Sequence, residues 1–146
     1  MKSAAYIFQH KASQFIHTIG PDETVYEAVH RMAEHNIGAL VVMDGEQVLG
    51  IVSERDYARK IILRARSSRE TTVREVMTTP VLSVAPEEDR DRCMALMTEH
   101  RFRHLPIMSE GRLLGLISIG DVVKDIISEQ EFTIDQLERY IADVKG

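Results

Sequence analysis

The chain has one cysteine, no tryptophan and no long apolar run among its 146 residues. The single cysteine, Cys93, excludes a disulfide within the chain, and its place on an apolar helix face favours a buried, unreactive thiol. The longest core-like runs, Ala39–Met43 and Leu113–Ile117, have only the length of strands, far short of the ~18 residues of a membrane span. The apolar run within Met1–Phe8 is shorter than that of a typical signal peptide. We therefore expect a soluble, cytoplasmic protein.

Motifs of catalysis and metal binding are also missing. No G-x-S-x-G, P-loop or G-x-G-x-x-G pattern occurs, and one cysteine cannot form a metal-binding pair. Histidines are present, but His100 and His104 are separated by a predicted change from helix to strand. We expect a protein that is not an enzyme and that holds neither a metal ion nor a catalytic cofactor.

The charge balance is mildly acidic. A formal net charge of -5 argues against broad binding to nucleic acid or to an anionic membrane. A basic tract from Arg55 to Arg74 is interrupted by acidic residues and has no interleaved aromatic residues for base stacking. A solvated helix face is the simpler interpretation of this tract, and a nucleic-acid-binding strip is the alternative.

The second half of the chain repeats the first at a constant offset of 65 residues. Ile16–Ile62 aligns without a gap to Val81–Ile127. Identical pairs include Pro21/Pro86, Glu34-His35/Glu99-His100, Leu49-Gly50/Leu114-Gly115, Ser53/Ser118, Asp56/Asp121 and Ile61-Ile62/Ile126-Ile127. A fixed internal period indicates one supersecondary unit used twice. Two small units of this kind should pack around a pseudo-two-fold axis and form two related clefts.

Each repeat predicts the same order of elements, β-α-β-β-α, and hence an α/β (α+β) fold. In the first repeat we expect a strand at 15–19, a helix opening at 21–24, strands at 37–43 and 48–52, and a helix at 55–66. In the second repeat we expect a strand at 81–84, a helix carrying Cys93, strands at 102–108 and 113–117, and a helix at 121–129. The polar segment 66–72 is a predicted linker. The units are expected at 7–67 and 72–130.

A further helix is expected at 131–146. Thr133-Ile-Asp-Gln136 has the pattern of a capping box, which would begin a new helix there. Ile134, Leu137, Ile141 and Val144 form a narrow apolar stripe. Packing of this stripe on its own module and packing on a second subunit are both open.

The most specific local pattern is Gly50-Ile-Val-Ser53-Glu-Arg-Asp56, echoed by Gly115-Leu-Ile-Ser118-Ile-Gly-Asp121. Each copy lies where a strand runs into a helix. In structural terms, Ser-x-x-Asp is a variant capping box. In functional terms, a helix start suits an anion, a hydroxyl can bind phosphate, and a carboxylate can accept ribose hydroxyls. The glycine would let a ligand approach the backbone.

These features resemble the CBS domain, named after cystathionine β-synthase, and the tandem pair resembles a Bateman module. The resemblance rests on the element order, the doubled Gly-h-h-Ser-x-x-Asp segment, Val76-Met-Thr-Thr-Pro80 and Arg101-Phe-Arg-His-Leu-Pro106. It covers about Lys11 to Glu129. It implies that adenosine nucleotides bind in the clefts between the repeats.

For the second repeat, the resemblance implies that Asp121 binds ribose hydroxyls, that Ser118 binds a phosphate or ribose oxygen, and that Arg103 and His104 face phosphate. The adenine would lie along the segment Ala12–His17. The implied adenine-side residues are Ala12, Phe15 and His17.

For the first repeat, the resemblance implies that Ser53 and Asp56 bind the nucleotide and that Arg55 partly replaces the basic pair. Its adenine slot would be lined by Met77, Thr78 and Pro80. Here Gly38 and Ala39 stand where the second repeat has Arg103 and His104. We therefore expect unequal sites, with the Asp121 site favoured for a monophosphate.

The resemblance implies a regulatory module that senses AMP, with ADP, ATP or NAD as alternatives. We expect a homodimer, in the flat-disk arrangement usual for the family, that signals to a separate effector protein. The alternative is a nucleic-acid-binding or scaffolding protein that uses the fold without a nucleotide.

Overall fold

The first repeat folds into a small sheet flanked by helices, as predicted, although its first strand covers only Thr18–Ile19 of the expected 15–19. The computed structural model describes residues 2–145. Its first-half elements are β1 (Thr18–Ile19), α2 (Val25–His35), β2 (Ala39–Asp44), β3 (Gln47–Ser53), α3 (Glu54–Tyr57) and η1 (Ala58–Ile62), a π-helical turn. Helix α2 begins after Thr24, whose hydroxyl accepts a hydrogen bond from the Glu27 N–H, and ends at Asn36 in the left-handed conformation. The strands pair in the order β1-β2-β3.

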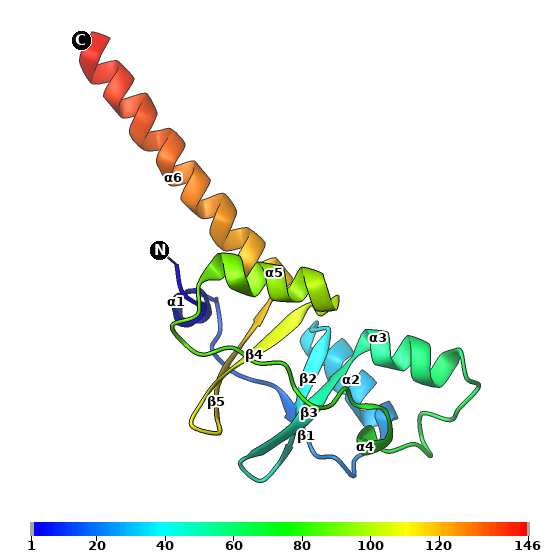
Figure 1. The fold of residues 1–146 in the computed structure, drawn as a ribbon. Coiled ribbons are helices and arrows are strands. Elements are labelled where there is room, and N and C mark those ends of the chain that lie inside the picture. Colours follow the sequence, from blue (N-terminus) through cyan, green and yellow to red (C-terminus); the bar gives the residue numbers. More distant parts are fainter. Residues whose placement is uncertain (1, 146) are drawn as a thin grey trace.

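The second repeat places its main elements at the same offset. Helix α5 (Arg90–His100) and strands β4 (His104–Ser109) and β5 (Arg112–Ser118) each lie 65 residues after α2, β2 and β3. Val84 makes an isolated parallel bridge to Ile107 where β1 stands in the first repeat. The predicted fold class, two copies of one α/β unit, is confirmed, and Figure 1 shows the two small sheets side by side at the centre of the molecule.

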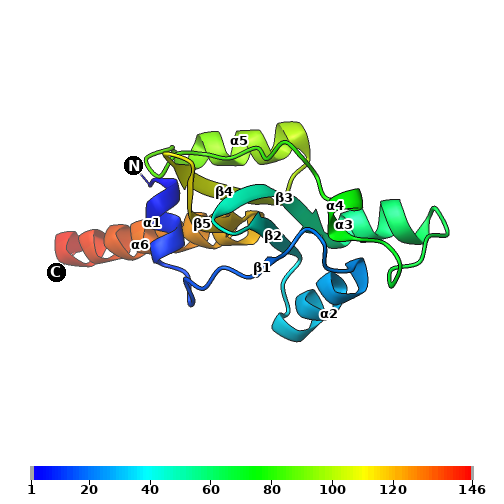
Figure 2. The ribbon, with the colours of Figure 1, turned by 90° about the horizontal axis from the view of Figure 1, so that it is seen from below.

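Each half has its own core, and each core is completed by a segment that precedes the other half. Helix α1 (Ala4–Gln9) places Ala4 and Ile7 in the core of the second repeat, with Cys93 and Ile117. Helix α4 (Val73–Val76) places its two valines in the core of the first repeat. The N-terminal helix lies against the second half in both views (Figures 1 and 2). Cys93 is fully buried, as expected.

The C-terminal helix begins earlier than predicted. Helix α6 runs without a break over Ile119–Lys145, so the predicted separate start at Thr133 is wrong. The Thr133 hydroxyl donates to the Glu129 carbonyl one turn back, at 3.0 Å, and therefore does not cap a new helix. In the first repeat the equivalent helical segment is shorter than predicted and ends at Ile62.

Only the beginning of α6 packs on the body. Val122 is buried, and Arg90 on α5 forms ion pairs with Asp125 (2.8 Å) and Glu129. From Ile127 to Val144 every side chain is exposed. Figure 1 shows this part of α6 extending away from the rest of the molecule. Packing of the C-terminal stripe on its own module is therefore excluded.

Candidate functional site

Asp56 is held at the start of α3 by a complete capping box. Its Oδ2 accepts hydrogen bonds from the Ser53 N–H (3.0 Å) and hydroxyl (3.1 Å), while the Ser53 Oγ accepts from the Asp56 N–H (3.2 Å). Its Oδ1 binds the Thr78 hydroxyl (3.1 Å) and lies 3.0 Å from Lys60 Nζ. The structural interpretation of this motif is thus confirmed. The carboxylate is buried and already fully paired.

Asp121 occupies the equivalent place in the second repeat but has a different cationic partner. Its Oδ2 accepts from the Ser118 N–H at 2.8 Å and forms an ion pair with Lys11 Nζ at 2.9 Å. The same ammonium group donates to the Leu116 carbonyl at 3.0 Å. Lys11 comes from the segment after α1. The chain itself therefore covers the carboxylate that was expected to bind ribose.

The charges around Asp121 also shift pKa values. Burial alone would raise the pKa of Asp121, but the hydrogen bonds from Lys11 and from the Ser118 N–H outweigh it, and the pKa is lowered. Burial lowers the pKa of His104, and Lys11 and Arg103 lower it further against the opposing effect of Asp121. His104 is therefore a neutral imidazole at neutral pH.

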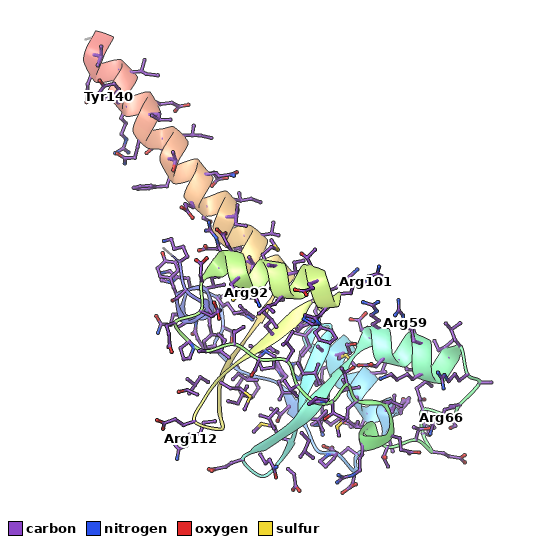
Figure 3. All side chains as sticks on the ribbon, in the orientation of Figure 1. Arg59, Arg66, Arg92, Arg101, Arg112 and Tyr140 are labelled. Carbon is purple, nitrogen blue, oxygen red and sulfur yellow. The ribbon has the colours of Figure 1, made fainter. Side chains whose placement is uncertain are left out.

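A cavity of about 870 Å³ lies between the repeats on the Asp56 side. Its volume falls within the ~300–1,000 Å³ typical of small-molecule sites. Ser53, Asp56 and Thr78 lie on its lining, together with Pro80. Cationic side chains from both repeats complete it, namely Arg55, Arg59, Lys60, Arg101 and Arg103, and the neutral imidazole of His104 lies beside them. Figure 3 shows Arg59 and Arg101 on the same side of the molecule, whereas Arg112 lies at the far tip of the β4–β5 hairpin.

The predicted basic pair also reaches the cavity of Asp56, while His104 stays near enough to Asp121 for that carboxylate to oppose the lowering of its pKa. Arg103 and His104 line the cavity of Asp56, where Gly38 also lies. The start of β4 meets the start of β2 at the junction between the repeats, and a Cβ on Gly38 would lie 3.5 Å from the His104 ring. The absence of a basic pair at 38–39 therefore does not leave the first cleft without basic residues. Arg55 also crosses the junction and donates to the Arg101 carbonyl at 2.7 Å.

The remaining predicted site residues lie outside this cavity lining. Ala39 is buried in β2, and Met77 packs against the first core. Ala12 and Phe15 are exposed in the segment between α1 and β1. The His17 ring stacks on His35 at 4.1 Å, and burial followed by the charge of His35 lowers the pKa of His17.

The glycine before each serine serves the protein's own packing. A Cβ on Gly50 would lie 2.8 Å from the Thr78 carbonyl, and Ile51 and Thr78 exchange two backbone hydrogen bonds there. A Cβ on Gly115 would lie 2.8 Å from the Phe8 ring. The prediction that these glycines admit a ligand is wrong, because chain segments already occupy both places.

Sequence reasoning missed Lys11 and Lys60 as partners of the two aspartates. Lys60 could have been found, since it follows Asp56 by four residues on one helix face. Lys11 carries no such local signal, because its partner lies 110 positions further along the chain. Within residues 2–145, no three His, Cys, Asp or Glu side chains are grouped to hold a metal ion, and no helix has the length and apolar content to cross a membrane.

Comparisons with known proteins give a consistent result. The sequence profile of the CBS domain matches twice, at residues 12–63 and 73–128. The Arabidopsis thaliana protein named CBS domain-containing protein CBSX3, mitochondrial, is 46% identical over 125 residues, which cover 82% of this chain and 61% of that protein. The chain thus spans less than two thirds of that relative's length.

Two solved structures show similar folds. A Burkholderia ambifaria MC40-6 protein, described provisionally as a signal-transduction protein with CBS domains, is 51% identical, with a TM-score of 0.85 over 88% of this chain and 96% of that one. A hexameric CBS-CP12 protein from bloom-forming cyanobacteria is 27% identical, with a TM-score of 0.75 over 100% of this chain and 89% of that one.

Proposed function

This chain belongs to the family of CBS-domain proteins and carries the domain twice, and on that premise we propose that it is a cytoplasmic regulatory protein that binds an adenosine nucleotide. AMP is the first candidate, with ADP, ATP and NAD as alternatives. The protein acts by binding and performs no turnover. The observation that carries the proposal is the cavity between the repeats, which combines hydroxyl and carboxylate groups with a cluster of basic side chains.

The arrangement of charge in the cavity supports a phosphorylated ligand. Arg103 lies on the second repeat, while Arg55 and Arg59 lie on the first, so an anion between them would contact both halves. Arginine–phosphate bonds are charge-assisted and contribute roughly 1.5–3 kcal/mol each when shielded from water. The ribose would lie toward Ser53, Asp56 and Thr78, where Lys60 or Thr78 must release an oxygen of Asp56 to a ribose hydroxyl.

The first cleft is the primary site in this proposal, which reverses the ranking expected from the sequence. In the second cleft, Lys11 bonds both Asp121 and the Leu116 carbonyl. A ribose there must displace the ammonium group, and this lowers the affinity. We therefore propose that Ser118 and Asp121 form a secondary site, with Ala12, Phe15 and His17 beside it.

Occupancy would be transmitted through the geometry of the two repeats. A nucleotide held by residues from both halves favours one inter-repeat angle, and a coupling of ~1–3 kcal/mol suffices to alter a partner's affinity. The partner is a separate effector protein. We also propose that the chain self-associates as a homodimer; the hexameric cyanobacterial relative supports self-association.

The test is a thermal-shift panel of AMP, ADP, ATP, NAD and GMP, followed by calorimetric titration of any nucleotide that stabilises the protein. A ligand at about 100 times its dissociation constant adds roughly 2.7 kcal/mol of stability. Arg103→Ala is expected to weaken AMP binding about tenfold or more while leaving adenosine binding unchanged. Arg112→Ala, which removes the same charge at the distant hairpin, is the matched control and should bind like the wild type.

Two results would contradict the proposal. One is a panel without any adenosine-nucleotide stabilisation, together with duplex or RNA binding that weakens steeply with salt, which would favour a nucleic-acid-binding protein. The other is an equal loss of AMP affinity in Arg103→Ala and Arg112→Ala, which would show that AMP does not bind in this cavity.

A further inference from the structure

The exposed part of α6 carries an apolar pattern with a period of seven. If Ile127 is given position a of a heptad, the a and d positions from 123 onward are Val123, Ile127, Gln130, Ile134, Leu137, Ile141 and Val144. All but Gln130 are apolar. Apolar residues at a and d over three heptads are typical of a helix that pairs with another helix.

These side chains are exposed in the single chain. The apolar a and d residues of α6 are between 41% and 68% exposed. A fully exposed aliphatic side chain offers on the order of 100 Å², and Tyr140 and the stems of Glu131 and Glu138 flank the seam. Pairing two α6 helices would then bury on the order of 1,000 Å² in total, which reaches the lower limit for a specific interface.

The flanking charges favour the parallel orientation. The e positions include Glu131 and Glu138, while the adjacent g positions are Ile126, Thr133 and Tyr140. In a parallel pair each e residue faces a g residue, so the glutamates meet uncharged partners. In an antiparallel pair e faces e, which would place Glu131 of one helix near Glu138 of the other and repel.

We propose that residues 123–144 of α6 form a parallel, two-stranded coiled coil with the same segment of a second copy of this chain. Isoleucine at a combined with leucine at d favours two strands, and this chain has isoleucine at all three a positions from 127 to 141 and leucine at d position 137. Gln130 is the one polar residue among these a and d positions. Its pairing with Gln130 of the second copy fixes the register of the two helices. This inference names the surface for the proposed self-association, and it does not depend on nucleotide binding.

The first experiment measures the mass of the full chain by sedimentation over a concentration series. We expect a dimer in the micromolar range for the wild type. Ile134→Glu, at an a position, is expected to weaken dimerisation about tenfold or more, because it buries a charge in the seam. Phe132→Glu is the matched control, since Phe132 is 65% exposed but stands at position f, away from the seam. Circular dichroism checks that both variants keep the folded body.

The second experiment tests orientation by disulfide trapping. Ile141→Cys places equivalent thiols opposite each other only in a parallel pair, so oxidation should produce a covalent dimer. Phe132→Cys should not. The native Cys93 does not compete, because it is fully buried and burial raises its pKa to about 11.

A wild type that stays monomeric to roughly 100 micromolar, or a dimer equally stable in Ile134→Glu and Phe132→Glu, would overturn the inference. A dimer weakened by Ile134→Glu that traps no Ile141→Cys disulfide would overturn the parallel orientation. The nucleotide titration on Ile134→Glu separates the two proposals, since nucleotide binding is expected to persist in a monomer.

Discussion

Replacing Lys11 by methionine tests how the chain stabilises its second cleft. Lys11→Met keeps the length of the side chain but removes the ammonium group that lies 2.9 Å from Asp121 and 3.0 Å from the Leu116 carbonyl. The two side chains of the ion pair are 27% and 22% exposed. The pair therefore lies between an exposed ion pair, at most about 1 kcal/mol, and a buried charge-assisted bond, about 1.5–3 kcal/mol. We expect a loss of about 1–2 kcal/mol at neutral pH.

The loss should depend on pH in a defined direction. In the wild type the folded-state pKa of Asp121 is lowered below its ordinary value of 3.8, so this carboxylate stabilises the fold above that pH and the contribution is lost as pH falls through the folded pKa. In Lys11→Met, burial is opposed only by the Ser118 hydrogen bonds, so the pKa of Asp121 rises relative to the wild type and the ionised carboxylate stabilises the fold less. The difference between the two proteins should therefore be largest at neutral pH and shrink in acid.

Urea unfolding followed by circular dichroism measures this difference from about pH 7 to about pH 3. Lys124→Met is the matched control, since Lys124 is exposed on α6 and outside both clefts. It should change stability by less than about 0.5 kcal/mol at every pH. A Lys11→Met loss that is the same in acid as at neutral pH would refute the assigned ion pair.

Three further outcomes are expected. Gly50→Ala should lower the free energy of unfolding by about 1–3 kcal/mol in urea titration, because its Cβ would lie 2.8 Å from the Thr78 carbonyl; an unchanged stability would show that this segment can move away. The His104 contribution should be complete above its unfolded pKa of 6.5 and lost as pH falls through its lowered folded pKa, so stability should vary less with pH in His104→Gln than in the wild type. Cys93 should resist iodoacetamide in the native protein and react only as urea unfolds it, as followed by intact mass.

The internal repeat made most of the fold predictable. Strands and helices of the second half follow those of the first at the offset read from the sequence, because each repeat has its own apolar pattern and helix-start residues. The prediction that a separate C-terminal helix begins at Thr133 was wrong for a local reason. Thr133 has the pattern of a cap, but its hydroxyl can bond the Glu129 carbonyl within the helix, and nothing at this point breaks the helix.

The candidate site was predictable in part. The Ser53–Asp56 pattern identified one wall of the cavity, because hydroxyl and carboxylate at a helix start are readable from local spacing. The grouping of Arg103 with Asp56 could not be predicted from the sequence, because it depends on how the two repeats meet. The same holds for the contact of Lys11 with Asp121, which joins residues from opposite ends of the chain.

The exchanged segments α1 and α4 make the two halves thermodynamically inseparable. If the chain were cut in the 66–72 linker, the N-terminal fragment would keep α1 without its core, and the C-terminal fragment would keep α4 without its core. Each fragment would then expose apolar side chains that the intact chain buries, Ile7 in α1 and Val73 and Val76 in α4. Unfolding should accordingly be a single cooperative transition. A change that destabilises either half therefore lowers the stability of the other half as well.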